Sequence, residues 1–295
     1  MRIAYFGLPL GVEVLRRNGV VPAVLGLGHP DAPGARRVRD RAKNHPGQLI
    51  LGRPDLNADD VVAAIASARP DVILSWFWPF KIPARVLALA PRGAFGVHPS
   101  LLPRWRGRDP YYWALRAGDT NTGVTLHRLD AEYDTGEILA SRSVPIRDND
   151  NSWSLAKRLD RPSLSLLIDC AKRLQAGEAL HGVPQSDKEV TLAPRPEDND
   201  LVLSFHESTR DVLLQIRAAA PEPGASAQLD EAFVTVLRAR AFEGSLPRAL
   251  EPAEALVNGD GVHVRTADGA ITLLRVRTED DETLEGADIR KLFRK

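Results

Sequence analysis

The stretch that decides the fold reads Ala94-Phe95-Gly96-Val97-His98-Pro99-Ser100-Leu101-Leu102-Pro103. Its first four residues are small or apolar and predict a short buried strand, which ends at a histidine. Two prolines around a pair of leucines then predict a rigid turn. In α/β sheets, ligands bind beyond the carboxyl ends of the strands, so a histidine at this point indicates a reaction centre.

Upstream of this stretch, short apolar runs alternate with helical patterns. Between Asp59 and Ala68, apolar residues recur at helical spacing and acidic residues stand at the start, which predicts a helix. Strands are predicted at Ile3 to Phe6, Val20 to Leu27, Val72 to Ser75 and Ala94 to Val97. This alternation predicts the α/β class, with a doubly wound, mainly parallel sheet.

Downstream, the character of the sequence changes. Val183 to Asn199 is polar and contains three prolines, as expected of a linker. An amphipathic helix is predicted from Ser208 to Ala220, followed by strands of alternating polarity at Phe233 to Arg238, Val262 to Arg265 and Ala270 to Arg277. We therefore expect a smaller β-barrel-like domain, and domain boundaries of 1–185, 186–200 for the linker and 201–295.

The composition sets further limits. A chain of 295 residues with 43% hydrophobic residues is long enough for two domains with a substantial core. Its 39 basic and 39 acidic residues cancel, so no global field would attract nucleic acid or an anionic membrane. A single cysteine, Cys170, and the lack of a long apolar run predict a cytoplasmic protein without a membrane anchor.

Three further motifs complete a recognisable pattern: Arg106-Gly107-Arg108, the run from Gly123 to Arg128, and Tyr133-Asp134-Thr135-Gly136. With the stretch around His98, they resemble the folate-dependent formyltransferases, which move a formyl group from 10-formyltetrahydrofolate to an amine. The run from Gly123 is similar to the branch that formylates UDP-4-amino-4-deoxy-L-arabinose. The C-terminal part is similar to the second domain of methionyl-tRNA formyltransferases. The resemblance implies a Rossmann-like fold with a smaller OB-like C-terminal domain.

His98 and Asp134 are the candidate catalytic residues. The ordinary pKa of histidine, near ~6.5, suits proton transfer, and a neighbouring carboxylate would orient the ring and raise its basicity. The two residues can meet if a strand from Thr122 to Leu129 pairs beside the strand that ends at His98. We interpret the remaining histidines as core or surface residues: His29, His45, His127, His181, His206 and His263.

In the family an asparagine stands two residues before the histidine, and here that position holds Gly96. The loss of one oxyanion donor typically costs roughly 10²- to 10³-fold in rate. Glycine also leaves room beside the histidine. Three possibilities follow: another group replaces the donor, the pocket has changed its one-carbon chemistry or its acceptor, or the enzyme is degenerate. Two other functions also stay open: folate binding without turnover, and hydrolysis of 10-formyltetrahydrofolate by water.

The resemblance also implies binding residues. Two segments would hold the pterin ring of the folate, and the loops after His98 would line the acceptor site. The cofactor-binding candidates are Phe80, Lys81, Ile82, Arg108, Asp130, Ala131, Glu132 and Tyr133. The substrate-binding candidates are Arg108, Leu102 and Tyr111, with Arg106 as a structural partner. A guanidinium suits a carboxylate or phosphate, and no metal is expected.

The predicted acceptor is a small amine, most plausibly on a nucleotide-linked amino sugar. Residues 201–295 carry 12 Lys and Arg against 16 Asp and Glu, whereas binding to a phosphate backbone requires clustered positive charge. Transfer RNA is therefore disfavoured, although methionyl-tRNA remains the alternative acceptor. We interpret the basic cluster from Arg36 to Lys43 as a solvated helix face with i,i+4 charge partners. The oligomeric state, with a homodimer as one option, stays open.

Overall fold

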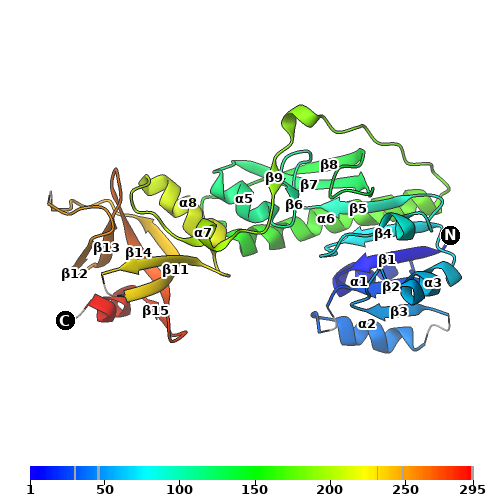
Figure 1. Ribbon diagram of the computed structural model, residues 1–295, viewed down its shortest axis with the longest axis horizontal. Coiled ribbons are helices and arrows are strands. Elements are labelled where there is room, and N and C mark those ends of the chain that lie inside the picture. The colour runs from blue at the N-terminus through cyan, green and yellow to red at the C-terminus, as the bar shows by residue number, and fades with distance from the viewer. Residues whose placement is uncertain (30, 45–46, 231, 248, 294–295) are drawn as a thin grey trace. The chain divides into compact units, whose positions relative to one another are not determined.

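The computed structural model describes residues 1–29, 31–44, 47–230, 232–247 and 249–293. The chain forms two compact units, each built from separate segments (Figure 1). The first unit contains residues 1–108, 122–144 and 158–193. The second contains residues 109–121, 145–157 and 194–295.

A seven-stranded sheet forms the centre of the first unit, in the order β3-β2-β1-β4-β5-β7-β8. The strands are β1 (Ile3–Gly7), β2 (Val24–Leu27), β3 (Leu49–Gly52), β4 (Val72–Trp76), β5 (Ala94–His98), β7 (Asn121–Arg128) and β8 (Ile138–Pro145). The first five are parallel to their neighbours, and β7 runs antiparallel to β5. The predicted mainly parallel sheet of an α/β domain is confirmed.

Helices connect the parallel strands: α1 (Pro9–Arg17), α2 (Ala35–Ala42), α3 (Asp59–Ser67) and α4 (Ala84–Leu87). The predicted helix at Asp59 is confirmed as α3, whose Ile65 packs into a core with Phe6, Ile73 and Val86. The long helix α6 (Ser152–Gln175) follows β8. Its Ser163 accepts a hydrogen bond of 2.9 Å from the indole nitrogen of Trp76 in the buried interior.

One predicted strand is shorter than expected. The sequence pattern predicts a strand from Val20, but β2 begins at Val24. The N–H of Val20 instead donates to the oxygen of Leu15 and closes the end of α1. Pro22 has no N–H to offer a sheet, so the chain joins the sheet only after it, with the N–H of Ala23 bonded to Ile3.

An antiparallel sheet of six strands forms most of the second unit, as predicted for the C-terminal domain. Its strands are β10 (Ala225–Leu229), β11 (Ala232–Ala241), β12 (Ala255–Asn258), β13 (Gly261–Arg265), β14 (Ala270–Thr278) and β15 (Thr283–Glu285). The predicted helix is confirmed as α8 (Thr209–Ala219), with Ser208 as its N-cap, and it packs against β11. The unit also contains α5 (Pro110–Arg116), α7 (Asp198–Leu201) and a 3-10 segment, η2 (Gly286–Phe293).

The polar stretch from Val183 to Asn199 contains more regular structure than its prolines suggest. A short 3-10 turn, η1, covers Asp187–Glu189. Strand β9 (Leu192–Ala193) pairs in parallel with β6 (Arg106–Gly107), directly beside the predicted site. This stretch therefore supports the loop that follows β5.

Candidate active site

The site lies where β5 ends, next to β7. The register of the two antiparallel strands places Gly96 opposite His127 and His98 opposite Thr125. Because side chains alternate along a strand, all four positions share one face of the sheet. The predicted pairing of these two strands is confirmed, and it brings the two ends of the motif together.

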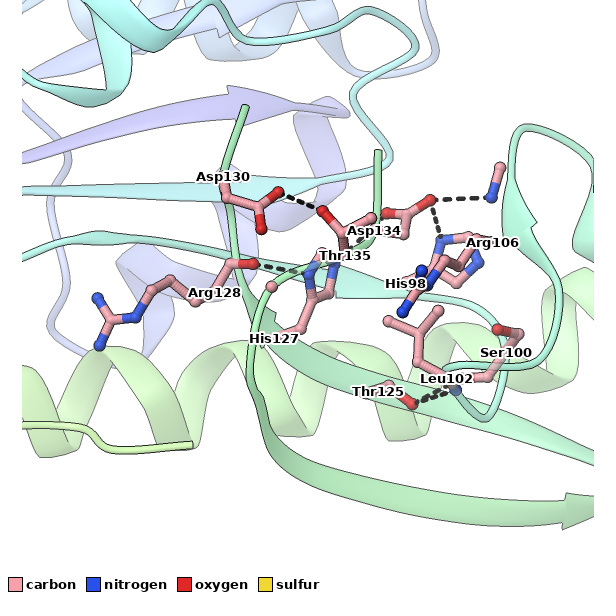
Figure 2. Close-up of polar contacts among 12 residues, drawn as sticks. His98, Ser100, Leu102, Arg106, Thr125, His127, Arg128, Asp130, Asp134 and Thr135 are labelled. Carbon is pink, nitrogen blue, oxygen red and sulfur yellow. Dashed lines mark hydrogen bonds and ion pairs between the residues drawn. The ribbon is translucent and has the colours of Figure 1, made fainter. Parts of the chain in front are cut away.

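His98 and Asp134 meet at this point (Figure 2). Nδ1 of His98 lies 3.4 Å from Oδ2 of Asp134, and both side chains are largely buried. The opposite ring nitrogen, Nε2, lies 2.8 Å from the main-chain oxygen of Trp105. The main-chain N–H of Gly107 donates to Oδ2 of Asp134 at 3.0 Å. The arrangement can orient an imidazole and exchange a proton with it.

Two residues that hold His98 have left-handed backbones. Trp105 has a φ of 61° and Asp134 a φ of 56°, a region that side chains other than glycine seldom adopt. Such conformations persist where the surrounding structure imposes them. Two hydrogen bonds to Thr191 fix the main chain at Trp105. The N–H of Trp105 donates to the hydroxyl of Thr191, and the N–H of Arg106 donates to its main-chain oxygen.

A third titratable side chain faces the same carboxylate, and the sequence interpretation of it was incomplete. His127 was interpreted as a core or surface residue, and its side chain is indeed only 2% exposed. Its Nε2, however, lies 3.5 Å from Oδ1 of Asp134. Burial lowers the pKa of His127, while the charge of Asp134 acts to raise it. The cross-strand position opposite Gly96 is the signal that would have found it.

The space beside Gly96 is smaller than the sequence suggests. A Cβ atom at this position would lie 2.8 Å from Cδ2 of Leu129 and 3.7 Å from Nε2 of His127. The expectation that the glycine leaves room is therefore wrong, because the side chain of Leu129 already fills it. The contact is with the tip of a flexible side chain, so a larger residue could displace it.

Thr125 holds the turn after His98 in place. Its hydroxyl donates to the oxygen of Ser100 at 2.7 Å and accepts from the N–H of Leu102 at 3.1 Å. Leu102, a substrate-binding candidate, is only 6% exposed. Its side chain therefore packs mainly against protein at the base of the turn.

The two segments predicted to hold the pterin ring lie together. Nζ of Lys81 lies 3.1 Å from the carboxylate of Glu132 and 5.9 Å from the ring centre of Tyr133. Phe80 and Tyr133 are exposed, whereas Ile82 is buried in the core. Ile82 can therefore offer a ligand little more than its main chain.

Hydrogen bonds shape the second of these segments. Asp130 accepts from the N–H of Glu132 at 3.2 Å and from the hydroxyl of Thr135 at 2.6 Å (Figure 2). Ala131 lies exposed at the tip of this turn. This turn places the side chain of Asp134 next to His98 and His127.

Gln185 is a site residue that the sequence interpretation did not find. Its side-chain oxygen accepts two hydrogen bonds from the guanidinium of Arg106, at 3.0 and 2.8 Å. Its amide nitrogen donates to the main-chain oxygens of Asp134 and Gly136. Arg106 is thus a structural partner, as predicted. Arg108 is exposed directly after Gly107.

The last substrate-binding candidate, Tyr111, belongs to the second unit. It lies half-buried on α5. Within the described part of the chain, His, Cys, Asp and Glu residues form no cluster of three or more that could hold a metal ion. None of the described helices is both long enough and apolar enough to cross a membrane.

Comparison with known proteins identifies the family. Residues 26–170 match the formyl transferase family, and residues 196–294 match the formyl transferase C-terminal domain. The methionyl-tRNA formyltransferase of Anaeromyxobacter dehalogenans is 33% identical over 312 residues, which cover 100% of this chain and 99% of that protein. The chain belongs to the formyltransferase family. It is a folate-dependent one-carbon transferase.

Solved structures share the fold. HypX from Aquifex aeolicus, solved with tetrahydrofolic acid, aligns with a TM-score of 0.67 at 21% identity over 99% of this chain. The chain spans 47% of the HypX chain. An N-formyltransferase from Helicobacter canadensis, solved with folinic acid and dTDP-3-aminofucose, aligns with a TM-score of 0.66 at 15% identity, covering 92% of this chain and 99% of that one.

Proposed function

We propose that this formyltransferase moves the formyl group of 10-formyltetrahydrofolate to the amine of a small acceptor, with His98 and Asp134 as the catalytic residues. The observation that carries the proposal is the buried pair of His98 and Asp134, whose side chains approach to 3.4 Å beside an exposed turn. When the amine attacks, the new C–N bond forms and charge develops on the formyl oxygen. When the tetrahedral intermediate collapses, the bond between the formyl carbon and N10 of the folate breaks, and tetrahydrofolate leaves. The pair of His98 and Asp134 would take up the proton that the amine releases and return a proton to N10.

The segments around Lys81 and Glu132 support the folate part of the proposal. The ion pair between these two residues links the segments that carry two exposed aromatic side chains, Phe80 and Tyr133. Flat heteroaromatic rings bind well among aromatic and apolar groups. Titration calorimetry with 5-formyltetrahydrofolate tests this step, and no heat of binding would contradict it.

Charge supports a small acceptor. Arg108 is exposed one residue after Gly107, whose N–H contacts Asp134, so its guanidinium is available to a phosphate or carboxylate at the edge of the site. The acidic balance of residues 201–295 disfavours a long phosphate backbone. In the basic cluster, Asp40 pairs with Arg36 at the predicted i,i+4 spacing and with Lys43 at i,i+3 spacing.

Methionyl-tRNA is the second candidate acceptor. Relatives of 29–34% identity are methionyl-tRNA formyltransferases, and most of those matches extend through the C-terminal domain. An assay with a labelled formyl group separates the candidates. We expect transfer to nucleotide-linked amino sugars, and no product from charged initiator tRNA. Preferred, salt-sensitive formylation of methionyl-tRNA would overturn the choice of acceptor.

The same assay tests the catalytic pair. Replacement of Asp134 by Asn should reduce kcat by roughly 10²- to 10⁴-fold, because the imidazole loses its charged partner. Formate released without any acceptor would indicate a hydrolase. Unchanged transfer in the Asp134→Asn variant would remove the pair from the mechanism.

A further inference from the structure

The carboxylate of Asp134 lies between two imidazole rings. Oδ2 faces Nδ1 of His98 at 3.4 Å, and Oδ1 faces Nε2 of His127 at 3.5 Å. The ring centres of the two histidines are 6.4 Å apart, and the planes are nearly perpendicular at 84°. Both rings are buried, with exposed fractions of 6% and 2%. No second carboxylate shares this position with Asp134 among the ion pairs of the described residues.

Main-chain oxygens fix a proton on the far side of each ring. Nε2 of His98 lies 2.8 Å from the oxygen of Trp105. Nδ1 of His127 lies 2.9 Å from the oxygen of Arg128, as Figure 2 shows. A carbonyl oxygen can only accept a hydrogen bond, so each of these nitrogens must carry a hydrogen. If both rings are neutral, the nitrogens that remain toward Asp134 have only lone pairs.

Two lone pairs facing an ionised carboxylate would repel it. The repulsion is strong here because the groups are buried and the local dielectric is low. A proton held between the carboxylate and one of the rings makes that facing pair attractive and reduces the repulsion, and it can serve only one of the two facing pairs at a time. The geometry therefore requires at least one proton beyond the two that the carbonyl oxygens fix.

We infer that His127 is a positioning residue for Asp134, and that His98, Asp134 and His127 share a proton as one coupled group. Its catalytic meaning rests on the proposed function. As the proton of His98 moves during transfer, His127 holds Oδ1 so that Asp134 keeps its place. The groups that face His127 are Asp134, His98 and the carbonyl of Arg128, with the charge of Asp130 farther out.

The position of Gly96 explains why this role matters in this chain. A side chain at residue 96 would begin 3.7 Å from Nε2 of His127, in the direct cross-strand position. With glycine there, residue 96 places no side chain beside that nitrogen, and Nε2 of His127 faces the carboxylate of Asp134 at 3.5 Å.

Nuclear magnetic resonance of the whole protein tests the inference without any catalytic readout. Long-range proton–nitrogen spectra of ¹⁵N-labelled protein report which ring nitrogens carry hydrogen. We expect hydrogen on Nδ1 of His127 and on Nε2 of His98 near neutral pH. We also expect the ring-nitrogen chemical shifts of His98 to change in the His127→Gln variant, and those of both rings to change in Asp134→Asn. His181→Gln, an exposed site, serves as the control and should move neither.

A hydrogen on Nε2 of a neutral His127, or ring-nitrogen shifts of His98 that stay unchanged in His127→Gln, would overturn the inference. The wild-type spectra require no variant, so the test survives if His127→Gln does not fold. A kinetic comparison adds the catalytic part: His127→Gln should shift the pH profile of kcat and leave KM unchanged. If no acceptor is ever formylated, the proposed function fails while the proton arrangement remains testable.

Discussion

The side-chain amide of Gln185 donates to the main-chain oxygen of Asp134 at 2.8 Å, and a second donation from the same amide reaches Gly136 at 2.7 Å. These bonds to the main chain help to hold Asp134 in its left-handed conformation, and they involve neither His98 nor His127. The side-chain oxygen of Gln185 accepts two hydrogen bonds from the guanidinium of Arg106. One uncharged side chain thus ties the β6 strand to the turn that carries the carboxylate.

Gln185→Ala should therefore lower kcat by up to roughly 10²-fold without removing any group that touches substrate, because a small displacement of Asp134 is enough to misalign it. Gln185→Glu is the matched variant. It still accepts from Arg106 but cannot donate to the two carbonyl oxygens, so it should be impaired as well. Steady-state kinetics on both variants, with melting curves as a folding check, decide the matter; wild-type kcat in Gln185→Glu would refute the role.

Introducing the asparagine that the family resemblance implies at residue 96 tests whether Gly96 limits the rate. If an oxyanion donor is missing, Gly96→Asn should raise the rate of formyl transfer by about 10²-fold. The new Cβ must displace Cδ2 of Leu129, so the double variant with Leu129→Ala should accept it more easily. Gly96→Ala adds the same carbon without the amide and serves as the control. An asparagine variant no faster than the alanine variant would show that another group already fills the role.

His127 should make the protein less stable in mild acid. Burial lowers its pKa below the ordinary value of 6.5, so below that value the unfolded chain binds the proton more readily than the folded chain does. Stability is therefore intact above the unfolded pKa and falls as the pH drops below it, by at most about 1.4 kcal/mol per pH unit for one proton. Denaturant melts across this range should show a shallower fall in His127→Gln than in wild type.

His263 contributes equally to the pH dependence of stability in wild type and in His127→Gln. Its pKa is also lowered, mainly by burial, so wild type and variant share its contribution. Only the difference between the two proteins reports His127. Parallel curves for the two would mean that His127 titrates alike in the folded and unfolded chain.

Cys170 should be inert in the native protein. Its side chain is 1% exposed on α6, and burial raises the pKa of the thiol to about 12. Since the thiolate is the reactive form, a disulfide reagent should label it only after denaturant unfolds the helix. Labelling of the folded protein at stoichiometric level would contradict the burial, and Cys170→Ser gives the blank.

Local patterns were sufficient for the sheet, whereas the pairing of His98 with Asp134 came from the resemblance to the formyltransferases. The apolar runs predict the parallel strands because such strands are buried on both faces. The meeting of two residues so far apart followed from one assumption, that the strand containing His127 pairs with the one ending at His98. The boundaries failed where Pro22 interrupts an apolar run, since the end of α1 uses Val20.

The remaining parts of the site depend on side-chain direction and on register, which a single sequence does not contain. His127 looked like any buried histidine until the pairing placed it opposite Gly96. The filling of the glycine's space by Leu129 depends on one rotamer. Gln185 lies in a stretch whose prolines indicate a linker, so its polar side chain gave no sign of contact with Arg106.

The discontinuous make-up of the second unit constrains how this protein can be recombined. Helix α5, from the middle of the chain, packs against α8 in that unit, and residues 145–157 also belong to it. A chimera joined to a relative at residue 194 would combine a foreign α8 with the original α5. Exchanging the second unit between homologues would therefore require exchanging the segments 109–121, 145–157 and 194–295 together.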